Sequence, residues 1–282
     1  MRIYHYTKAA TLPLILRNKT IRFTRADCLD DTYEVPFTNA HIDPKNFFIS
    51  SWTLQGLEQS GQWHRYGDQS AGVRISFEGS PFRWSNLSID VSRAFSASSP
   101  PKRVGLRFDD IEAPYDHDAI FGNGYLLVPD TAYLRREFGD RVMYVNNPIQ
   151  EASRFLKVED ETTTTYGRGS NLARIKGVAW ADQEEYRYVL FAKNGPQLDY
   201  SASPNAYTEA MLDMLEAEYF GDGIKLSPQP TFIDLPLDEM AFGSLTVTIG
   251  SKISDENREL VLSALRQFAP AAISEPSTLT VR

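Results

Sequence analysis

The sequence predicts an α+β fold built on mixed, mainly antiparallel sheets with flanking helices. Three observations support this prediction. Segments with strand patterns outnumber helical segments, the two kinds do not alternate regularly, and no glycine-rich phosphate loop stands between a strand and a helix. A doubly wound Rossmann fold needs both the alternation and the loop, so the sequence argues against it.

Short strand and helix patterns begin the chain. Residues 2–6 are rich in Ile and Tyr and predict a strand, and residues 9–17 predict a helix with its apolar side chains on one face. Residues 20–24 alternate apolar and polar side chains, as a half-buried strand does. A polar loop follows, and its carboxylates are Asp27, Asp30, Asp31 and Glu34.

The rest of the chain continues this mixture. Alternating, aromatic and β-branched residues predict further strands at 47–52, 73–77, 86–92, 103–108, 124–128, 141–145, 185–193 and 245–249. Apolar periodicity, an early proline and a capping serine predict helices at 61–67, 148–157, 206–220 and 254–268. Composition predicts a long insertion or loop at 93–123, a mobile loop around the threonines 162–165, and a tail that frays after Pro270.

Composition also limits the function classes. The 282 residues carry a formal net charge of −8, whereas general nucleic-acid binding needs a basic surface that neutralises phosphates. We therefore expect no general nucleic-acid binding, although a local basic pocket for a small anion stays possible. The single cysteine, Cys28, and the lack of a signal-peptide core or long apolar run predict a cytoplasmic protein without a membrane partner.

Familiar catalytic motifs are missing from the sequence. The four histidines have no metal-ligand spacing, and neither a Gly-x-Ser-x-Gly elbow nor a Walker loop is present. We therefore predict no metal site, since one would have to use carboxylates scattered along the chain. Three other patches remain as candidates for chemistry.

The first patch is Tyr4-His5-Tyr6-Thr7, at the end of the first predicted strand. Side chains and free backbone groups can both meet a ligand at a strand end. His5 can donate to a ribose hydroxyl there, while the backbone of the next residue binds a carboxamide. The alternative is a partly buried histidine whose hydrogen bonds are satisfied by backbone.

The second patch covers residues 61–67 and places Trp63 and Tyr66 on one helical face. One of these rings can stack on a planar base or on a nicotinamide ring. Ordinary core packing is the alternative role for both rings.

The third patch runs from Trp180 to Arg187 and contains two carboxylates and an amide before an apolar strand. Gln183 and Glu185 are two residues apart, so on an extended chain they point the same way. Such a pair can hold a hydroxyl group and a reacting nucleophile together. The alternative is a solvated acidic loop.

The order of these patches resembles the ADP-ribosyltransferase superfamily in its His-Tyr-Glu form. More specifically, the chain resembles an uncharacterised bacterial domain-of-unknown-function family that starts with a Tyr-His-Tyr-Thr strand. Further matching motifs are Asp31-Thr32-Tyr33-Glu34, the stretch from Trp63 to Val73, the Trp180–Arg187 segment and a strand-Gly-helix end from Val247 to about Leu265. The resemblance implies a single ADP-ribosyltransferase-like domain at 1–268, with a variable insertion at about 80–170 and a flexible tail at 269–282.

The resemblance also implies roles for particular residues, with NAD as the substrate. His5 would hold the ribose of the nicotinamide half, Tyr66 would stack on the nicotinamide, and Glu185 would stabilise the cation that forms as nicotinamide leaves. Gln183 would orient the acceptor and Ser51 would support the pocket. The residues expected to contact the cofactor are His5, Tyr6, Thr7, Ser51, Trp63, Tyr66 and Gln183.

Two main functions follow from these expectations. The first is an NAD-dependent ADP-ribosyltransferase with an unknown macromolecular acceptor, or an NAD glycohydrolase, in the setting of a bacterial toxin or antiphage effector. The second is a non-catalytic module of the same fold that binds a nucleotide or a nucleic-acid end. A third alternative is metal-dependent phosphoester chemistry on Asp27, Asp30, Asp31 and Glu34.

Overall fold

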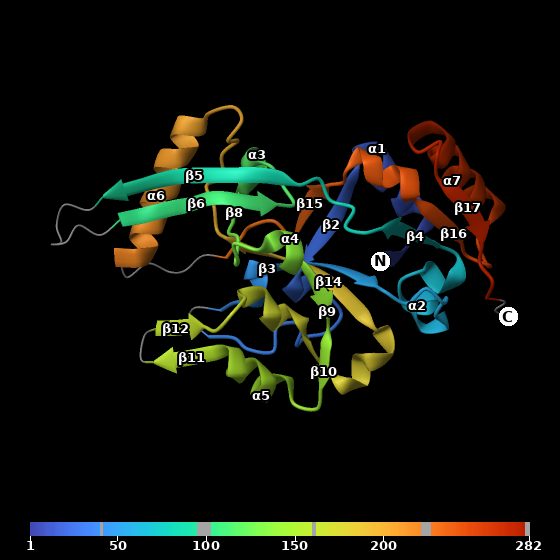
Figure 1. Cartoon of the computed structure of the whole chain (residues 1–282), viewed down its shortest axis with the longest axis horizontal. Helices are drawn as coiled ribbons and strands as arrows, with labels where there is room; N and C mark the ends of the chain where they lie inside the picture. The colour runs from blue at the N-terminus through green and yellow to red at the C-terminus, as the bar shows by residue number, and fades with distance from the viewer. Residues whose placement is uncertain (40–41, 95–102, 160–161, 221–226, 280–282) are drawn as a thin grey trace.

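The computed structural model describes residues 1–39, 42–94, 103–159, 162–220 and 227–279. It confirms a mixed α+β architecture in which most strand pairs are antiparallel (Figure 1). Among the described residues, no helix combines the length and the apolar character that crossing a membrane requires.

An 11-stranded sheet forms the centre of the molecule. Its main path is β17 (Ile273–Pro276), β16 (Thr246–Ile249), β4 (Val73–Glu78), β1 (Arg2–Thr7), β3 (Phe47–Thr53), β14 (Glu185–Lys193), β8 (Tyr125–Leu127) and β7 (Phe121–Gly122). Beside this path, β2 (Thr20–Arg25) pairs with β3 and with β15 (Phe232–Pro236), and β9 (Gly139–Arg141) pairs with β14. The pair β16–β17 is parallel.

Two helices share the larger apolar core with this sheet. α1 (Leu12–Asn18) and α7 (Asp255–Phe268) lie next to each other (Figure 1), and their buried side chains belong to the cluster that includes Ile3, Ile75 and Val247. α7 begins as the sequence predicts, because the Ser254 side chain accepts a hydrogen bond from the Asn257 N–H.

A second apolar cluster joins residues of β3 and β14 to the 143–177 region, including Phe47, Val189 and Ile175. This region holds α5 (Pro148–Ala152), the parallel pair β10 (Met143–Val145) and β13 (Ile175–Gly177), and the hairpin β11 (Leu156–Glu159) and β12 (Thr162–Thr165). The prediction of a mobile loop at 162–165 is therefore wrong. Four consecutive threonines favour strand geometry, because branching at Cβ fits a pleated sheet.

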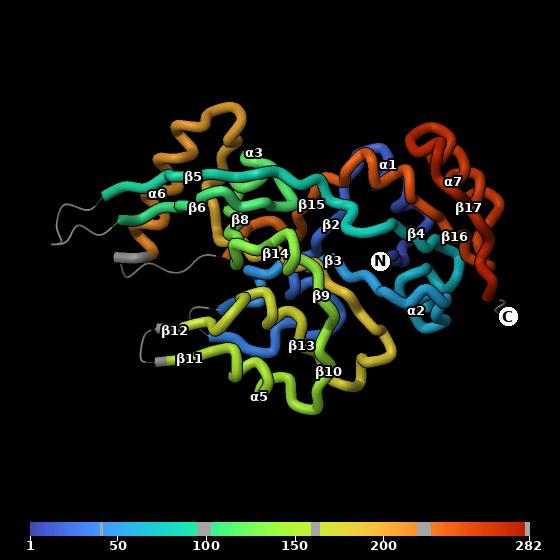
Figure 2. The backbone as a smooth tube through the Cα atoms, in the orientation of Figure 1, coloured from blue at the N-terminus to red at the C-terminus, as the bar shows by residue number. Residues whose placement is uncertain are grey.

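A long hairpin, β5 (Ser85–Ala94) and β6 (Arg103–Ala113), lies beside α6 (Pro204–Phe220), as both views show (Figures 1 and 2). The part of the expected 93–123 loop that the structure describes contains the end of β5, all of β6, the short α3 (His117–Ile120) and β7. Residues 95–102 of that expected loop lie outside the described residues. Ser- and Pro-rich composition misled the prediction for β6, whose own residues alternate between exposed and buried.

The tail that was expected to fray contains β17 instead. β17 pairs with β16, and the Ser277 N–H donates to the Ile249 carbonyl oxygen at 2.8 Å. Without the tail, this edge of β16 would present unpaired backbone groups, which accounts for the ordered strand.

Candidate functional site

The candidate site lies where the central sheet opens beside β3. β14 pairs along one edge of β3, so β1 and β2 share the other edge. β1 pairs there at Tyr4 and Thr53, whereas β2 pairs at Ile49 and Phe48. Residues 50–52 of β3 therefore face a gap between β1 and β2.

A cavity of about 210 Å³ occupies this gap. Its lining comes from β1, β2, β3 and β14, from the 28–34 loop, from Gln62 and Tyr66 of the α2 (Ser60–Arg65) region, and from Lys176 and Trp180. Pockets for whole drug-sized ligands are larger, roughly 300–1,000 Å³. The cavity thus has room for one part of a dinucleotide.

Five of the predicted site residues line this cavity: His5, Tyr6, Ser51, Tyr66 and Glu185. They come from the first strand, from β3, from the end of α2 and from β14, so they are far apart in the sequence. The His, Tyr and Glu named by the resemblance therefore line one cavity.

Three of the predicted cofactor-binding residues do not line the cavity. Trp63 is only 1% exposed, packs edge-on against Tyr6 at 5.1 Å and donates to Glu58, so it forms the wall behind Tyr6. Thr7 is buried at the end of β1. Gln183 is fully buried behind Tyr66 and reaches the ligand space only through its contacts.

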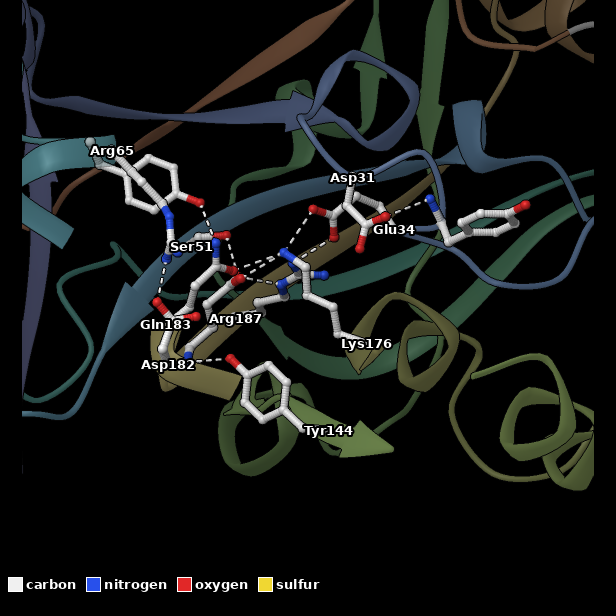
Figure 3. A network of polar contacts seen from close by, with 12 residues as sticks. Asp31, Glu34, Ser51, Arg65, Tyr144, Lys176, Asp182, Gln183 and Arg187 are labelled. Carbon is white, nitrogen blue, oxygen red and sulfur yellow. Dashed lines mark hydrogen bonds and ion pairs between the residues drawn. The ribbon is translucent and has the colours of Figure 1, made fainter. Parts of the chain in front are cut away.

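A network of four buried charges forms one side of the site (Figure 3). The Lys176 ammonium lies 3.1 Å from Glu34 Oε1 and 2.9 Å from Glu185 Oε1. The Arg187 guanidinium lies 2.5 Å from Glu34 Oε2 and 2.7 Å from Glu185 Oε2. None of the four side chains is more than 5% exposed, and the two cations balance the two carboxylates.

Glu185 is ionised in this setting. Burial alone would raise the pKa of its carboxyl group, but Arg187 and Lys176 outweigh burial and lower the pKa to about 2. The Ser51 hydroxyl also donates to Glu185 Oε2 at 3.0 Å. Oε2 thus accepts two hydrogen bonds and Oε1 accepts one, from Lys176, which leaves Oε1 able to accept another.

The backbone before Glu185 differs from the expected extended chain. Gln183 ends a 3-10 helix, η7 (Val178–Gln183), and Glu184 has a left-handed backbone with φ of 45°. The two side chains still meet, because both Gln183 Oε1 and Glu185 Oε1 contact the Lys176 ammonium. Their proximity comes from a shared cation and not from strand periodicity.

His5 is held as a neutral imidazole. Burial lowers its pKa, and its Nδ1 lies 2.8 Å from the backbone carbonyl oxygen of Ser51. A carbonyl oxygen can only accept, so Nδ1 carries the proton, and Nε2 of the neutral ring is an acceptor. His5 can therefore accept a hydrogen bond through Nε2, whereas the sequence suggested that it donates one.

Carboxylates of the polar loop at 27–34 are bound by groups of the protein itself. Asp31 accepts from the Tyr33 N–H at 2.9 Å, Glu34 pairs with Lys176 and Arg187, and Asp27 pairs with Arg25. Among the described residues, no group of three or more potential ligands is placed to hold a metal ion. The third alternative, phosphoester chemistry, thus has no ligand set in the described structure.

Lys176 and Arg187 were not among the predicted site residues. Arg187 follows Glu185 by two residues in β14, so it lies on the same face of the strand, and that spacing was a usable signal. Lys176 stands in an apolar stretch beside Ile175, and a lysine inside such a stretch is a sign of a buried, paired cation.

Comparison of the chain with protein-family models, with curated proteins and with solved structures finds no match.

Proposed function

We propose that this chain is an ADP-ribosyltransferase-like enzyme that cleaves the bond between nicotinamide and ribose in NAD. ADP-ribose would pass to a macromolecular acceptor or to water. The observation that carries this proposal is the convergence of His5, Tyr66 and an ionised Glu185 on one cavity in a gap of the sheet.

The chemistry of Glu185 fits the proposed reaction. Departure of nicotinamide leaves positive charge on the ribose, and a carboxylate close to that centre stabilises it. Glu185 is ionised, and Oε1 can still accept one hydrogen bond, which a ribose hydroxyl can donate. The neutral His5 supplies a second acceptor for the same sugar.

The charge of the cavity also fits a cationic ring. Arg22 lines the cavity but is paired with Asp234 through two hydrogen bonds. Asp30 lines it as well, and no ion pair of Asp30 occurs within the described residues. The buried network is neutral and Arg22 is balanced by Asp234 outside the lining, so among the described lining residues Asp30 is the charge without an ion-pair partner, and its carboxylate favours the positively charged nicotinamide of NAD.

Incubation with NAD and chromatographic detection of released nicotinamide tests this proposal. We expect release above the level of a buffer control, and Glu185→Gln should lower the rate by about 10²–10³-fold, as removal of such electrostatic stabilisation does elsewhere. Mass spectrometry of the protein and of added acceptors then separates transfer from hydrolysis. No release by the folded wild-type protein would rule out the enzyme.

A second candidate is a non-catalytic module that binds the nicotinamide half of a nucleotide. The two ion pairs of Glu185, with Lys176 and with Arg187, favour this candidate. A carboxylate whose charge is already neutralised stabilises a nearby ribose cation less strongly than a free carboxylate does. This candidate requires NAD binding in a calorimeter without release of nicotinamide. The enzyme requires both.

A further inference from the structure

The Gln183 side chain belongs to the polar network of Figure 3, and the chemistry of its partners fixes which atoms donate and which accept. The Lys176 ammonium lies 3.0 Å from the Gln183 side-chain oxygen, and an ammonium can only donate. The amide oxygen must therefore face Lys176, which turns the amide nitrogen towards Tyr66. That nitrogen donates to the Tyr66 hydroxyl oxygen at 2.9 Å.

The Tyr66 hydroxyl consequently has a proton to offer. Its oxygen accepts from Gln183, and within the described residues this hydroxyl donates no hydrogen bond of its own. Burial, together with the nearby carboxylates of Glu185, Asp30 and Glu34, raises the pKa of this phenol, so it stays protonated at neutral pH. Tyr66 also lines the cavity, so a bound ligand can accept that proton in a hydrogen bond.

We propose that Tyr66 acts on the ligand through its hydroxyl group, as a hydrogen-bond donor whose direction Lys176 and Gln183 set. The ligand places an acceptor oxygen at Tyr66 and a donor at His5 Nε2. This inference deepens the proposed function and, for NAD, rests on it. The acceptor oxygen is then either the carboxamide oxygen or a ribose oxygen, and the Tyr66 ring is not the main source of affinity.

A measurement without ligand tests the direction itself. The tyrosine ring doublet in the Raman spectrum reports whether a phenol donates or accepts, and the difference between wild type and Tyr66→Phe isolates Tyr66. We expect the signature of an acceptor. Gln183→Glu replaces the amide donor by a carboxylate acceptor of the same shape, so the signature should change to that of a donor. A donor signature in the wild type would overturn the proposal, whether or not NAD is a substrate.

A binding measurement tests whether the Tyr66 hydroxyl donates its proton in a hydrogen bond to the ligand. Tyr66→Phe keeps the ring and removes only the hydroxyl, and we expect NAD affinity to fall roughly 5- to 10-fold in calorimetry, the usual value of one hydrogen bond. Gln183→Glu should weaken binding in the wild type but change it little in the Tyr66→Phe background, because both changes remove the same donor. Unchanged affinity of the folded Tyr66→Phe variant would show that the ring is sufficient.

The analogue thionicotinamide adenine dinucleotide separates the two sources of the acceptor oxygen. Its sulfur accepts hydrogen bonds weakly. If Tyr66→Phe weakens NAD but not this analogue, the carboxamide oxygen is the partner, and equal weakening assigns a ribose oxygen. If the wild type binds neither compound while the Raman result holds, NAD fails as the ligand and the direction of the Tyr66 hydroxyl stands.

Discussion

Glu185 has two roles at the scale of single residues. It is the proposed stabiliser of the ribose cation, and it is one of the carboxylates that hold Lys176 and Arg187 in the interior. Removal of one partner from a buried ion pair costs about 3–5 kcal/mol. A loss of stability in Glu185→Gln thus cannot assign a catalytic role, and Glu34→Gln is the matched control because Glu34 contacts the same two cations.

Acid should destabilise the protein through Glu185. Its pKa is lowered to about 2 from an ordinary value of 4.5, so the stabilisation is complete above the higher value and is lost as the pH falls towards the lower one. A shift of this size corresponds to roughly 3 kcal/mol in the free energy of unfolding. Urea unfolding from neutral pH to about pH 2 measures it. Identical pH dependence in wild type and Glu185→Gln would contradict the expected linkage.

Asp30 should contribute to the choice of a cationic ring. It lines the cavity on its exposed side, so we expect Asp30→Asn to weaken NAD binding by only about 2- to 5-fold, in keeping with a solvent-screened charge. Binding of neutral nicotinamide should not change. Calorimetry with NAD and with nicotinamide tests this. Equal weakening of both would show that Asp30 affects the shape of the cavity and does not select a cationic ring by its charge.

His5, Tyr66 and Glu185 could be proposed from the sequence as neighbours in one cavity, because each stands in a short motif with a recognisable order. Lys176 and Arg187 could not be assigned, since a buried cation is recognised only when its carboxylate partners are known. Those partners are brought together by the sheet, and Glu34 lies 142 residues from Lys176 in the sequence. Which ring nitrogen of His5 carries the proton likewise depends on its contact with the Ser51 carbonyl oxygen across the gap.

At the scale of elements, Glu58 ties the C-terminal strand to the wall of the site. Its carboxylate accepts from Trp63 Nε1, from the Ser277 hydroxyl and from the Thr278 N–H and hydroxyl. The tail after β17, the loop before α2 and the ring behind Tyr6 are therefore linked.

Glu58→Gln should lower the free energy of unfolding by about 1 kcal/mol, a value reduced by solvent exposure of the group. In a chain that ends at Ala269, the same substitution should cost less, because Ser277 and Thr278 are gone. Urea unfolding of the full and the shortened chain, each with and without Glu58→Gln, gives the coupling free energy between Glu58 and the tail. Strict additivity would show that the tail and Glu58 stabilise the fold independently.

Local sequence signals predicted most helices and strands, but not the strand at the edge of the sheet. The capped start of α7 and the strand β14 follow from nearby residues, since capping and alternation are local properties. β17 is short and exposed along its length, so its sequence shows no alternation of apolar and polar residues that would predict a strand. It forms a strand because it pairs with the edge of β16.

At the scale of the whole molecule, the β5–β6 hairpin and α6 lie side by side (Figures 1 and 2), and none of their described residues lines the cavity. Arg93 joins them through Glu209, Asp213 and Glu216. Arg93→Ala should lower the melting temperature slightly, as the loss of exposed ion pairs does, and leave NAD affinity unchanged. A marked loss of affinity in calorimetry would show that the hairpin is coupled to the site.

The α+β class was predictable because it depends on how many strand and helix patterns occur and in what order. The gap beside β3 was not, since it arises from where β1 and β2 end along a shared edge, and long-range pairing sets those positions. The gap is nevertheless what turns three separate motifs into one cavity.

The most direct measurement is the rate of nicotinamide release from NAD by wild type, Glu34→Gln and Glu185→Gln under conditions where all three are folded. Both substitutions disturb the same buried cations, but only Glu185 accepts the proposed ribose hydroxyl. We expect release by the wild type, a modest decrease in Glu34→Gln, and a decrease of about 10²–10³-fold in Glu185→Gln. Absence of release by the wild type, or equal rates in the two variants, would contradict the proposed chemistry.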